Sequence, residues 1–195
     1  MTVNIIQSIL KYRFKNTALL ERALTRKTYS AENGGEDNES LEFVGDSMLN
    51  CAVTIALVKR YGISKEDSRW KALAKTNPTF FNDKEIEEVL TEIRSALVCK
   101  LYLANRATEH KIHNHIRMGK GDIKLHMEQQ DSVKEDLLEA LIGAIALDSD
   151  FDMPTIVKVV EHLLYIDRAM RRREYDPKER FLCRLLKKVF TVKGR

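Results

Sequence analysis

The sequence predicts an all-α protein with one main domain. Its 195 residues are 44% hydrophobic and 32% charged, which is enough apolar material for one well-packed core and too short a chain for two. Only 8 Gly and 3 Pro interrupt the chain, and Ala, Leu, Lys, Glu and Arg dominate it. This composition, with few aromatic residues, indicates helices nearly throughout.

The N-terminal third is predicted to hold three helices. Residues 4–24 fit two short amphipathic helices that meet near residues 12–16, and residues 32–38, with two Gly and three acids, fit a polar loop. Asn38 is expected to cap the third helix, which continues through a run without charge between Asp46 and Lys59.

The middle and end of the chain supply two further segments. Residues 62–89 hold Trp70 and Phe80-Phe81, so we interpret them as an insertion with some packing of its own. A second largely apolar helix begins near Asp136 and has no charge between Glu139 and Asp148.

Each apolar helix carries two acids on a face that its pattern predicts to be buried. Glu42 and Asp46 are four residues apart and Asp136 and Glu139 are three apart, so each pair shares one helical face. Gly143 lies one turn beyond Glu139 on that face, where it lets another backbone come close. Paired carboxylates in apolar surroundings normally share a cation or a proton.

We therefore expect the two helices to pack side by side and bring the four acids together as a site for divalent metal. Oxygen ligands without nearby Cys or His favour Mg²⁺ or Mn²⁺ over zinc. The alternative is two ordinary exposed faces, because many helices carry acids at these spacings. Two such pairs on otherwise uncharged apolar helices favour the metal site.

Two motifs resemble those of the ribonuclease III endonucleases. Residues 38–46, Asn-Glu-Ser-Leu-Glu-Phe-Val-Gly-Asp, resemble the signature of that family, and residues 135–144, Glu-Asp-Leu-Leu-Glu-Ala-Leu-Ile-Gly-Ala, resemble its second acidic motif. Residues 12–25, 94–98 and 117–121 match further segments of the family in the same order. The resemblance covers residues 5–165, which makes it far more specific than one short motif.

The resemblance implies a helical endonuclease domain over residues 1–165 that forms a homodimer and processes RNA. Such a domain would cleave double-stranded RNA with Mg²⁺, or Mn²⁺ in its place, and leave 5′ phosphates and short 3′ overhangs. Bound Mg²⁺ would supply a nucleophilic hydroxide and neutralise phosphate charge. A-form RNA is recognised mainly by shape, so little sequence specificity is expected.

The resemblance also assigns roles to individual residues. Glu42, Asp46, Asp136 and Glu139 match the metal-site acids, while Glu39 and, across the insertion, Glu87 match accessory acids. Phe43 matches a residue that packs into the partner subunit. Lys120, which the sequence places in a Gly-Lys-Gly turn, matches a loop near substrate and is a candidate phosphate contact. Leu101 departs from the family, which commonly has Asn there.

The C-terminal tail, residues 166–195, is basic. Residues 168–195 carry a net charge of +8, so residues 1–167 sum to −4. Arg171, Arg172 and Arg173 are candidate RNA contacts, although a charge run is often only a solvated helix end. Residues 176–182 resemble the first helix of a double-stranded-RNA-binding domain. The chain is then either a minimal nuclease that uses its tail or a truncated form of a longer protein.

Other features limit the remaining functions. His110, His113 and His115 do not share one helical face, which favours a polar or RNA-facing surface over a zinc site. An odd set of three Cys, no secretion signal, and an apolar stretch that is too short and too polar for a bilayer predict a soluble intracellular protein of the cytoplasm, with the nucleus as the alternative. A dimerising, RNA-binding scaffold without hydrolysis stays open, and a di-iron protein is disfavoured because no His follows Glu39, Glu42 or Glu139 at the required spacing.

Overall fold

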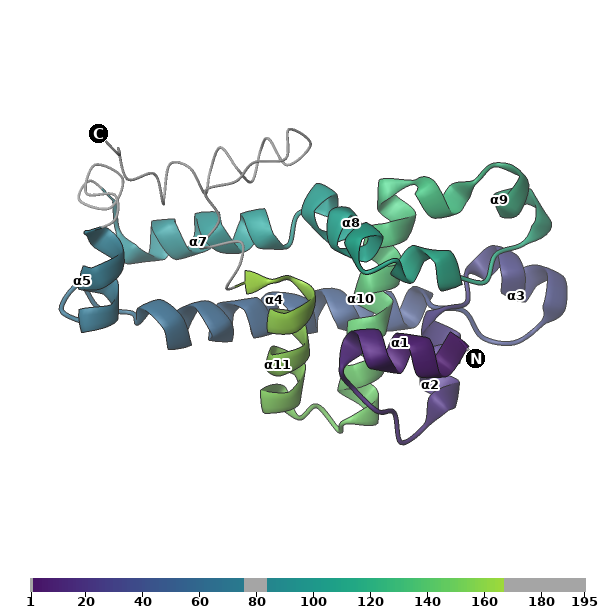
Figure 1. Ribbon diagram of the computed structural model, residues 1–195, viewed down its shortest axis with the longest axis horizontal. Coiled ribbons are helices and arrows are strands. Elements are labelled where there is room, and N and C mark those ends of the chain that lie inside the picture. The colour runs from purple at the N-terminus through teal and green to yellow at the C-terminus, as the bar shows by residue number, and fades with distance from the viewer. Residues whose placement is uncertain (1, 76–83, 167–195) are drawn as a thin grey trace.

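The computed structural model describes residues 2–75 and 84–166 (Figure 1). Within these residues the secondary structure is helical apart from an isolated bridge between Thr25 and Arg117, so the all-α prediction is confirmed. The helices, in chain order, are α1 (Thr2–Leu10), α2 (Thr17–Ala23), α3 (Lys27–Asn33), α4 (Glu39–Tyr61), α5 (Ser68–Ala74), α7 (Ile86–Leu97), α8 (Lys100–Glu109), η1 (Ile112–His115), α9 (Lys120–Lys124), η2 (Met127–Gln129), α10 (Asp131–Asp148) and α11 (Met153–Leu163).

Helix α4 is the long central element, and α10 crosses its N-terminal half (Figure 1). Helices α7 and α11 also pack against it. By length and composition alone α4 could span a membrane, so the expectation that this stretch is too short and too polar was wrong. A central core helix has the same composition, because it is apolar on most of its circumference. Its buried residues include Leu49, Val53 and Leu57.

Two glycines make the crossing of α4 and α10 possible. A Cβ atom on Gly45 would lie 1.8 Å from the backbone oxygen of Glu139, and one on Gly143 would lie 2.0 Å from the backbone oxygen of Leu41. No side chain fits at either position, so the two backbones touch directly. The close approach predicted for Gly143 is confirmed, and Gly45 provides its counterpart on α4.

Asp148 ties the end of α10 to the chain between α1 and α2. Its carboxylate accepts hydrogen bonds from the Tyr12 hydroxyl at 2.7 Å and from the backbone N–H groups of Lys15 at 2.9 Å and Asn16 at 2.8 Å. Burial alone would raise the pKa of Asp148, but these hydrogen bonds lower it. The charged carboxylate therefore fixes the N-terminal helices against the far end of α10.

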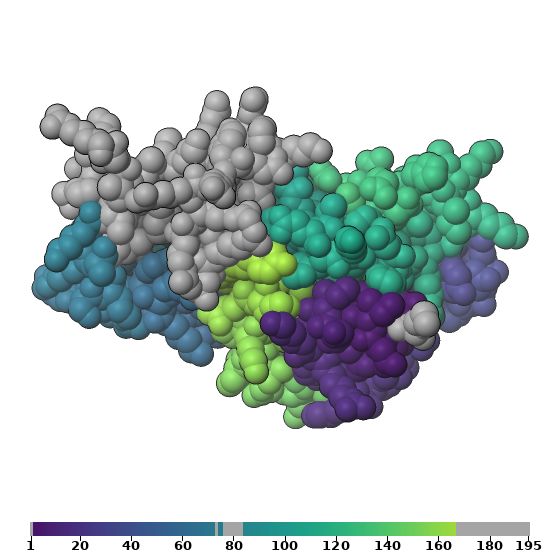
Figure 2. All heavy atoms as spheres, viewed as in Figure 1, coloured from purple at the N-terminus to yellow at the C-terminus, as the bar shows by residue number. Residues whose placement is uncertain are grey.

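The histidines that the sequence analysis assigned to a polar surface are partly structural. Nε2 of His110 lies 3.0 Å from the Leu163 carbonyl oxygen, and His113 is buried with Nδ1 3.3 Å from the Ala107 carbonyl oxygen. On the face in Figure 2, α1 in purple meets α11 in yellow-green and the segment around residues 100–115 in teal. The predicted RNA-facing patch is therefore wrong for these two residues, whose rings join elements of the core.

The segment from 62 to 89 contributes to packing where it is described. Trp70 on α5 is 3% exposed, and α7 begins within the segment at Ile86. A groove of about 610 Å³ lies between α7 and the C-terminal half of α4. Phe80 and Phe81 lie outside the described residues, as do residues 167–195 of the basic tail with Arg171, Arg172 and Arg173.

Candidate functional site

The first half of the site is the N-terminal part of α4. Asn38 precedes the helix as predicted, but its side chain makes no capping hydrogen bond. Instead its backbone N–H donates to the Thr25 carbonyl oxygen at 2.9 Å, which fixes the start of α4 against the turn before α3. Glu42 is half-buried one turn into the helix, and Asp46 is exposed one turn further, where it accepts a hydrogen bond from the Asn50 amide at 3.0 Å.

The second half of the site is the middle of α10. Glu139 is buried and Asp136 is half-buried, one turn before it. Burial raises the pKa of Glu139 to about 8, with further contributions from the charges of Asp46, Glu135 and Glu42. Without a cation, this carboxyl group is therefore largely protonated at neutral pH.

The four predicted acids interact across the crossing of the two helices. Burial raises the pKa of Glu42, and the charge of Asp136 on the other helix adds to the shift. Burial and the charge of Glu135 likewise raise the pKa of Asp136. The charges of Asp46 and Glu42 both act on Glu139, and the backbones of Gly45 and Glu139 touch, so the two pairs lie close together where the helices cross.

Two cations flank the acids. Lys100 of α8 forms an ion pair with Glu135 at 3.1 Å, and its charge also acts on Asp136 and Glu139. Arg26, at the start of α3, lowers the pKa values of Glu42 and Asp136 against the effect of burial. The sequence analysis missed Arg26, Lys100 and Glu135. Only Glu135 carried a signal, as a third acid beside Asp136.

The donor set suits a hard divalent cation. All four acids offer carboxylate oxygens, the ligands that Mg²⁺ prefers, and a cation would relieve the repulsion that raises the Glu139 pKa. Among residues 2–75 and 84–166, no three His, Cys, Asp or Glu side chains already converge as metal ligands would. Cation binding would therefore have to draw the carboxylate groups together.

The two accessory acids differ in position, and the charge of Glu39 acts on Glu42 in addition to the larger effects of burial and of Asp136. Glu39 is exposed at the start of α4 and forms an ion pair with Lys27 at 3.0 Å. Glu87 is exposed on α7, where it accepts a hydrogen bond from the Thr91 hydroxyl at 3.1 Å. It lines the groove opposite Thr54 of α4, two helical turns beyond Asp46. Within this one chain, Glu87 does not join the carboxylate cluster.

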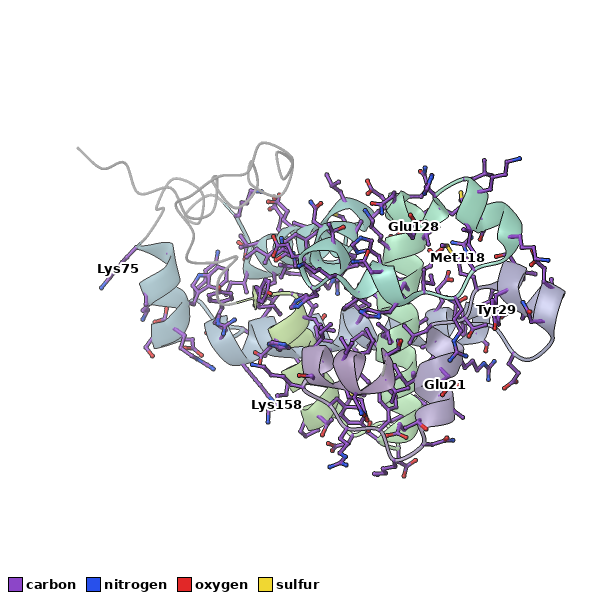
Figure 3. The ribbon with its side chains drawn as sticks, turned by 45° about the vertical axis from the view of Figure 1, so that its right-hand side comes forward. Glu21, Tyr29, Lys75, Met118, Glu128 and Lys158 are labelled. Carbon is purple, nitrogen blue, oxygen red and sulfur yellow. The ribbon has the colours of Figure 1, made fainter. Side chains whose placement is uncertain are left out.

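The remaining predicted residues are exposed. Phe43, beside Glu42, is 78% exposed. Lys120 begins the short helix α9 rather than lying in a simple turn, and its backbone N–H donates to Glu32 of α3 at 2.9 Å. Helices α3 and α9 form one end of the molecule, where Tyr29 and Met118 lie, opposite Lys75 (Figure 3). Leu101 is 38% exposed on α8.

The comparisons with known proteins agree with one another. A family model described as Ribonuclease-III-like matches residues 16–165. Ribonuclease 3 of Roseburia hominis is 44% identical over 157 residues, which are 79% of this chain and 44% of that protein. The chain therefore spans less than half of that relative's length.

Solved structures give the same result. The nuclease domain of ribonuclease III from Campylobacter jejuni has a TM-score of 0.63 and 25% identity, over 89% of this chain and 97% of that one. A second structure of that nuclease domain has a TM-score of 0.63 and 26% identity, over 84% of this chain and 99% of that one. It was described for structural flexibility in a region involved in dimer formation. Because the family model matches residues 16–165 and the similar proteins are ribonucleases III, the chain belongs to the ribonuclease-III-like family.

Proposed function

We propose that the chain is a Mg²⁺-dependent endoribonuclease that cleaves double-stranded RNA. The observation that carries the proposal is the joining of Glu42 and Asp46 with Asp136 and Glu139 where α4 crosses α10. Family membership and relatives named Ribonuclease 3 support the same activity. Mn²⁺ is expected to replace Mg²⁺, because it prefers the same oxygen ligands.

The four carboxylates would hold the metal and leave part of its coordination sphere to water and RNA. When bound, Mg²⁺ supplies a water of lowered pKa and neutralises charge on the phosphate. Burial disfavours the ionised forms of three of these groups, Glu42, Asp136 and Glu139. A bound cation would stabilise the ionised carboxylates, so burial favours cation binding. Lys120 and Arg171 to Arg173 remain candidate contacts to RNA phosphates, and products with 5′ phosphates and short 3′ overhangs are expected.

A duplex-cleavage assay tests this function. We expect a long RNA duplex to be cut in Mg²⁺ and to stay intact in EDTA. Asp46→Asn should lower the rate at least about 100-fold, because losing a ligand should exceed the 10–100-fold cost of losing an outer partner. Duplex binding by Asp46→Asn without products would fit this proposal, whereas binding without products by the unaltered protein in Mg²⁺ would favour the scaffold function.

We further propose that the active form is a homodimer with Phe43 at its interface. A 78% exposed Phe is otherwise unexplained, and its neighbour Glu42 would place the interface beside the acids of each subunit. Two active sites related by a twofold axis suit the two antiparallel strands of an RNA duplex.

Phe43→Ala should weaken the dimer without unfolding the monomer. Each dimer loses two buried aromatic side chains, which should raise the dissociation constant by about 100-fold or more. Sedimentation velocity over a range of concentrations measures this change. Leu125→Ala, which removes a 69% exposed apolar side chain from the residue after α9, is the matched control. Equal dissociation constants for the two variants would exclude Phe43 from the interface.

A further inference from the structure

Arg26 brings a fixed positive charge to the edge of the carboxylate site. Its backbone N–H donates to the Arg117 carbonyl oxygen at 3.0 Å, next to the bridge between Thr25 and Arg117. Its side chain is 21% exposed, and its charge acts on Glu42 and Asp136 from the two different helices. The Thr25 carbonyl oxygen accepts from the Asn38 backbone N–H at 2.9 Å, which fixes the residue before Arg26 at the start of α4, so the guanidinium group lies on the Glu42 side of the crossing of α4 and α10.

Asp122 of α9 holds this guanidinium group in place. Arg26 Nε lies 2.9 Å from Asp122 Oδ2, and the same oxygen accepts a hydrogen bond from the Thr28 hydroxyl at 2.7 Å. The Gly119 backbone N–H in turn donates to that hydroxyl at 3.1 Å. Asp122 is 13% exposed, so this ion pair is screened less than a surface pair.

The outer end of Arg26 is uncommitted. Within residues 2–75 and 84–166, Nε is buried and contacts Asp122 as an ion pair without hydrogen-bond geometry, and the two terminal guanidinium nitrogens form no hydrogen bond. These nitrogens carry four of the five N–H donors of an arginine, in the planar arrangement that matches two oxygens of a phosphate group. Asp122 thus orients the side chain and leaves its donors available.

A cation at this position does not strengthen metal binding. The charge of Arg26 repels a divalent cation at the carboxylates just as it repels protons there. The species that it favours is an anion that enters the same site. A phosphodiester has this charge, and it gains further negative charge on its oxygens as hydrolysis proceeds.

We propose that Arg26 is a further catalytic residue, whose terminal guanidinium nitrogens contact the phosphate that is being cleaved. The inference rests on the proposed function, because it takes RNA as the substrate of the carboxylate site. Asp122 and Thr28 act as positioning residues, which hold the guanidinium group in one orientation. The competing explanation is that Arg26 only joins α3 to α9.

The test compares Arg26→Gln with Lys27→Gln, which removes a positive charge from the next residue, where the side chain is 69% exposed and paired with Glu39. In single-turnover cleavage of an RNA duplex, Arg26→Gln should lower the rate about tenfold or more, the factor expected for one charge-assisted hydrogen bond. Lys27→Gln should leave this rate unchanged. Mn²⁺ binding to the free protein, followed by electron paramagnetic resonance, should be as tight in Arg26→Gln as in the unaltered protein, or tighter.

Chemical rescue separates contact from structure. Added guanidinium ion should restore part of the rate of Arg26→Ala and none of the rate of Asp46→Asn. The proposal is overturned if Arg26→Gln cleaves at the normal rate, or if its rate and Mn²⁺ affinity fall together without rescue.

Duplex binding in Ca²⁺ keeps this proposal separate from the proposed nuclease function. Should the unaltered protein not cut RNA at all, the nuclease function fails. The phosphate contact is then supported if Arg26→Gln weakens duplex binding more than Lys27→Gln does, and it is overturned if the two variants bind alike.

Discussion

Glu139→Gln is expected to abolish RNA cleavage and, at the same time, to stabilise the metal-free protein at neutral and alkaline pH. The substitution removes one of the four carboxylates that we assign to the metal, so the rate should fall at least about 100-fold. It also removes a buried group whose ionisation is unfavourable, because burial and the neighbouring acids raise its pKa to about 8. Activity and stability should therefore change in opposite directions.

The direction of the pH effect follows from the raised pKa. An acid with a higher pKa in the folded state than its model value of 4.5 favours folding while it is protonated. That contribution is complete below pH 4.5 and is lost as the pH rises through about 8. For a shift of this size the loss is on the order of 5 kcal/mol. Glu139→Gln should remove most of this pH-dependent loss of stability.

Urea denaturation in EDTA at about pH 5 and about pH 9 measures this difference. The free energy of unfolding of the unaltered protein should fall between these pH values much more than that of the variant. Glu85→Gln makes the same chemical change at an exposed residue paired with Lys65 and is the control. Parallel pH profiles for Glu139→Gln and the unaltered protein would show that Glu139 is not in a repulsive cluster.

Gly45→Ala should destabilise the protein by more than about 2 kcal/mol, because the new Cβ atom would meet a backbone oxygen at 1.8 Å. Helix propensity alone predicts the opposite sign, since Ala is favoured over Gly within a helix by about 1 kcal/mol. The obstacle is the main chain of α10 and cannot rotate away as a side chain could. The helices must separate, and Glu42 and Asp46 would then move relative to Glu139.

The Gly45→Ala variant should therefore show both a lower thermal unfolding temperature and slower Mg²⁺-dependent cleavage. Gly121→Ala is the matched control, because a Cβ atom there has no atom within 4 Å. A stabilised, active Gly45→Ala variant would mean that the crossing is looser than the structure shows.

The sequence contained enough information to predict the helices and the four acids. Glu42, Asp46, Asp136 and Glu139 stand out because each interrupts an apolar run at helical spacing, and Gly143 indicated where the backbones approach. These signals are local and periodic, so they survive without coordinates. The class of fold and the placing of the acids in one cluster follow from them.

The surroundings of the acids could not be predicted in this way. Arg26 and Asp122 are distant in the chain and meet only because α3 packs against α9. No spacing marks such a pair. His113 is likewise an ordinary polar residue in the sequence, and only the packing of η1 buries it. Asn38 makes no side-chain cap because its own backbone is already helical, and Asp37 accepts the hydrogen bond from the Glu39 backbone N–H at 3.1 Å instead.

The position of Asp148 has a consequence for how the domain comes apart. The family match begins at residue 16, so helix α1 lies before it. Yet Tyr12 and Lys15 donate to the same carboxylate that ends α10. These donors follow α1 directly, and Ile6 and Leu10 of α1 are themselves buried in the core, so α1 should not fray independently of this anchor. In hydrogen exchange, the amides of α1 should exchange in the same cooperative unfolding unit as those of α10, although α1 is the first helix of the chain.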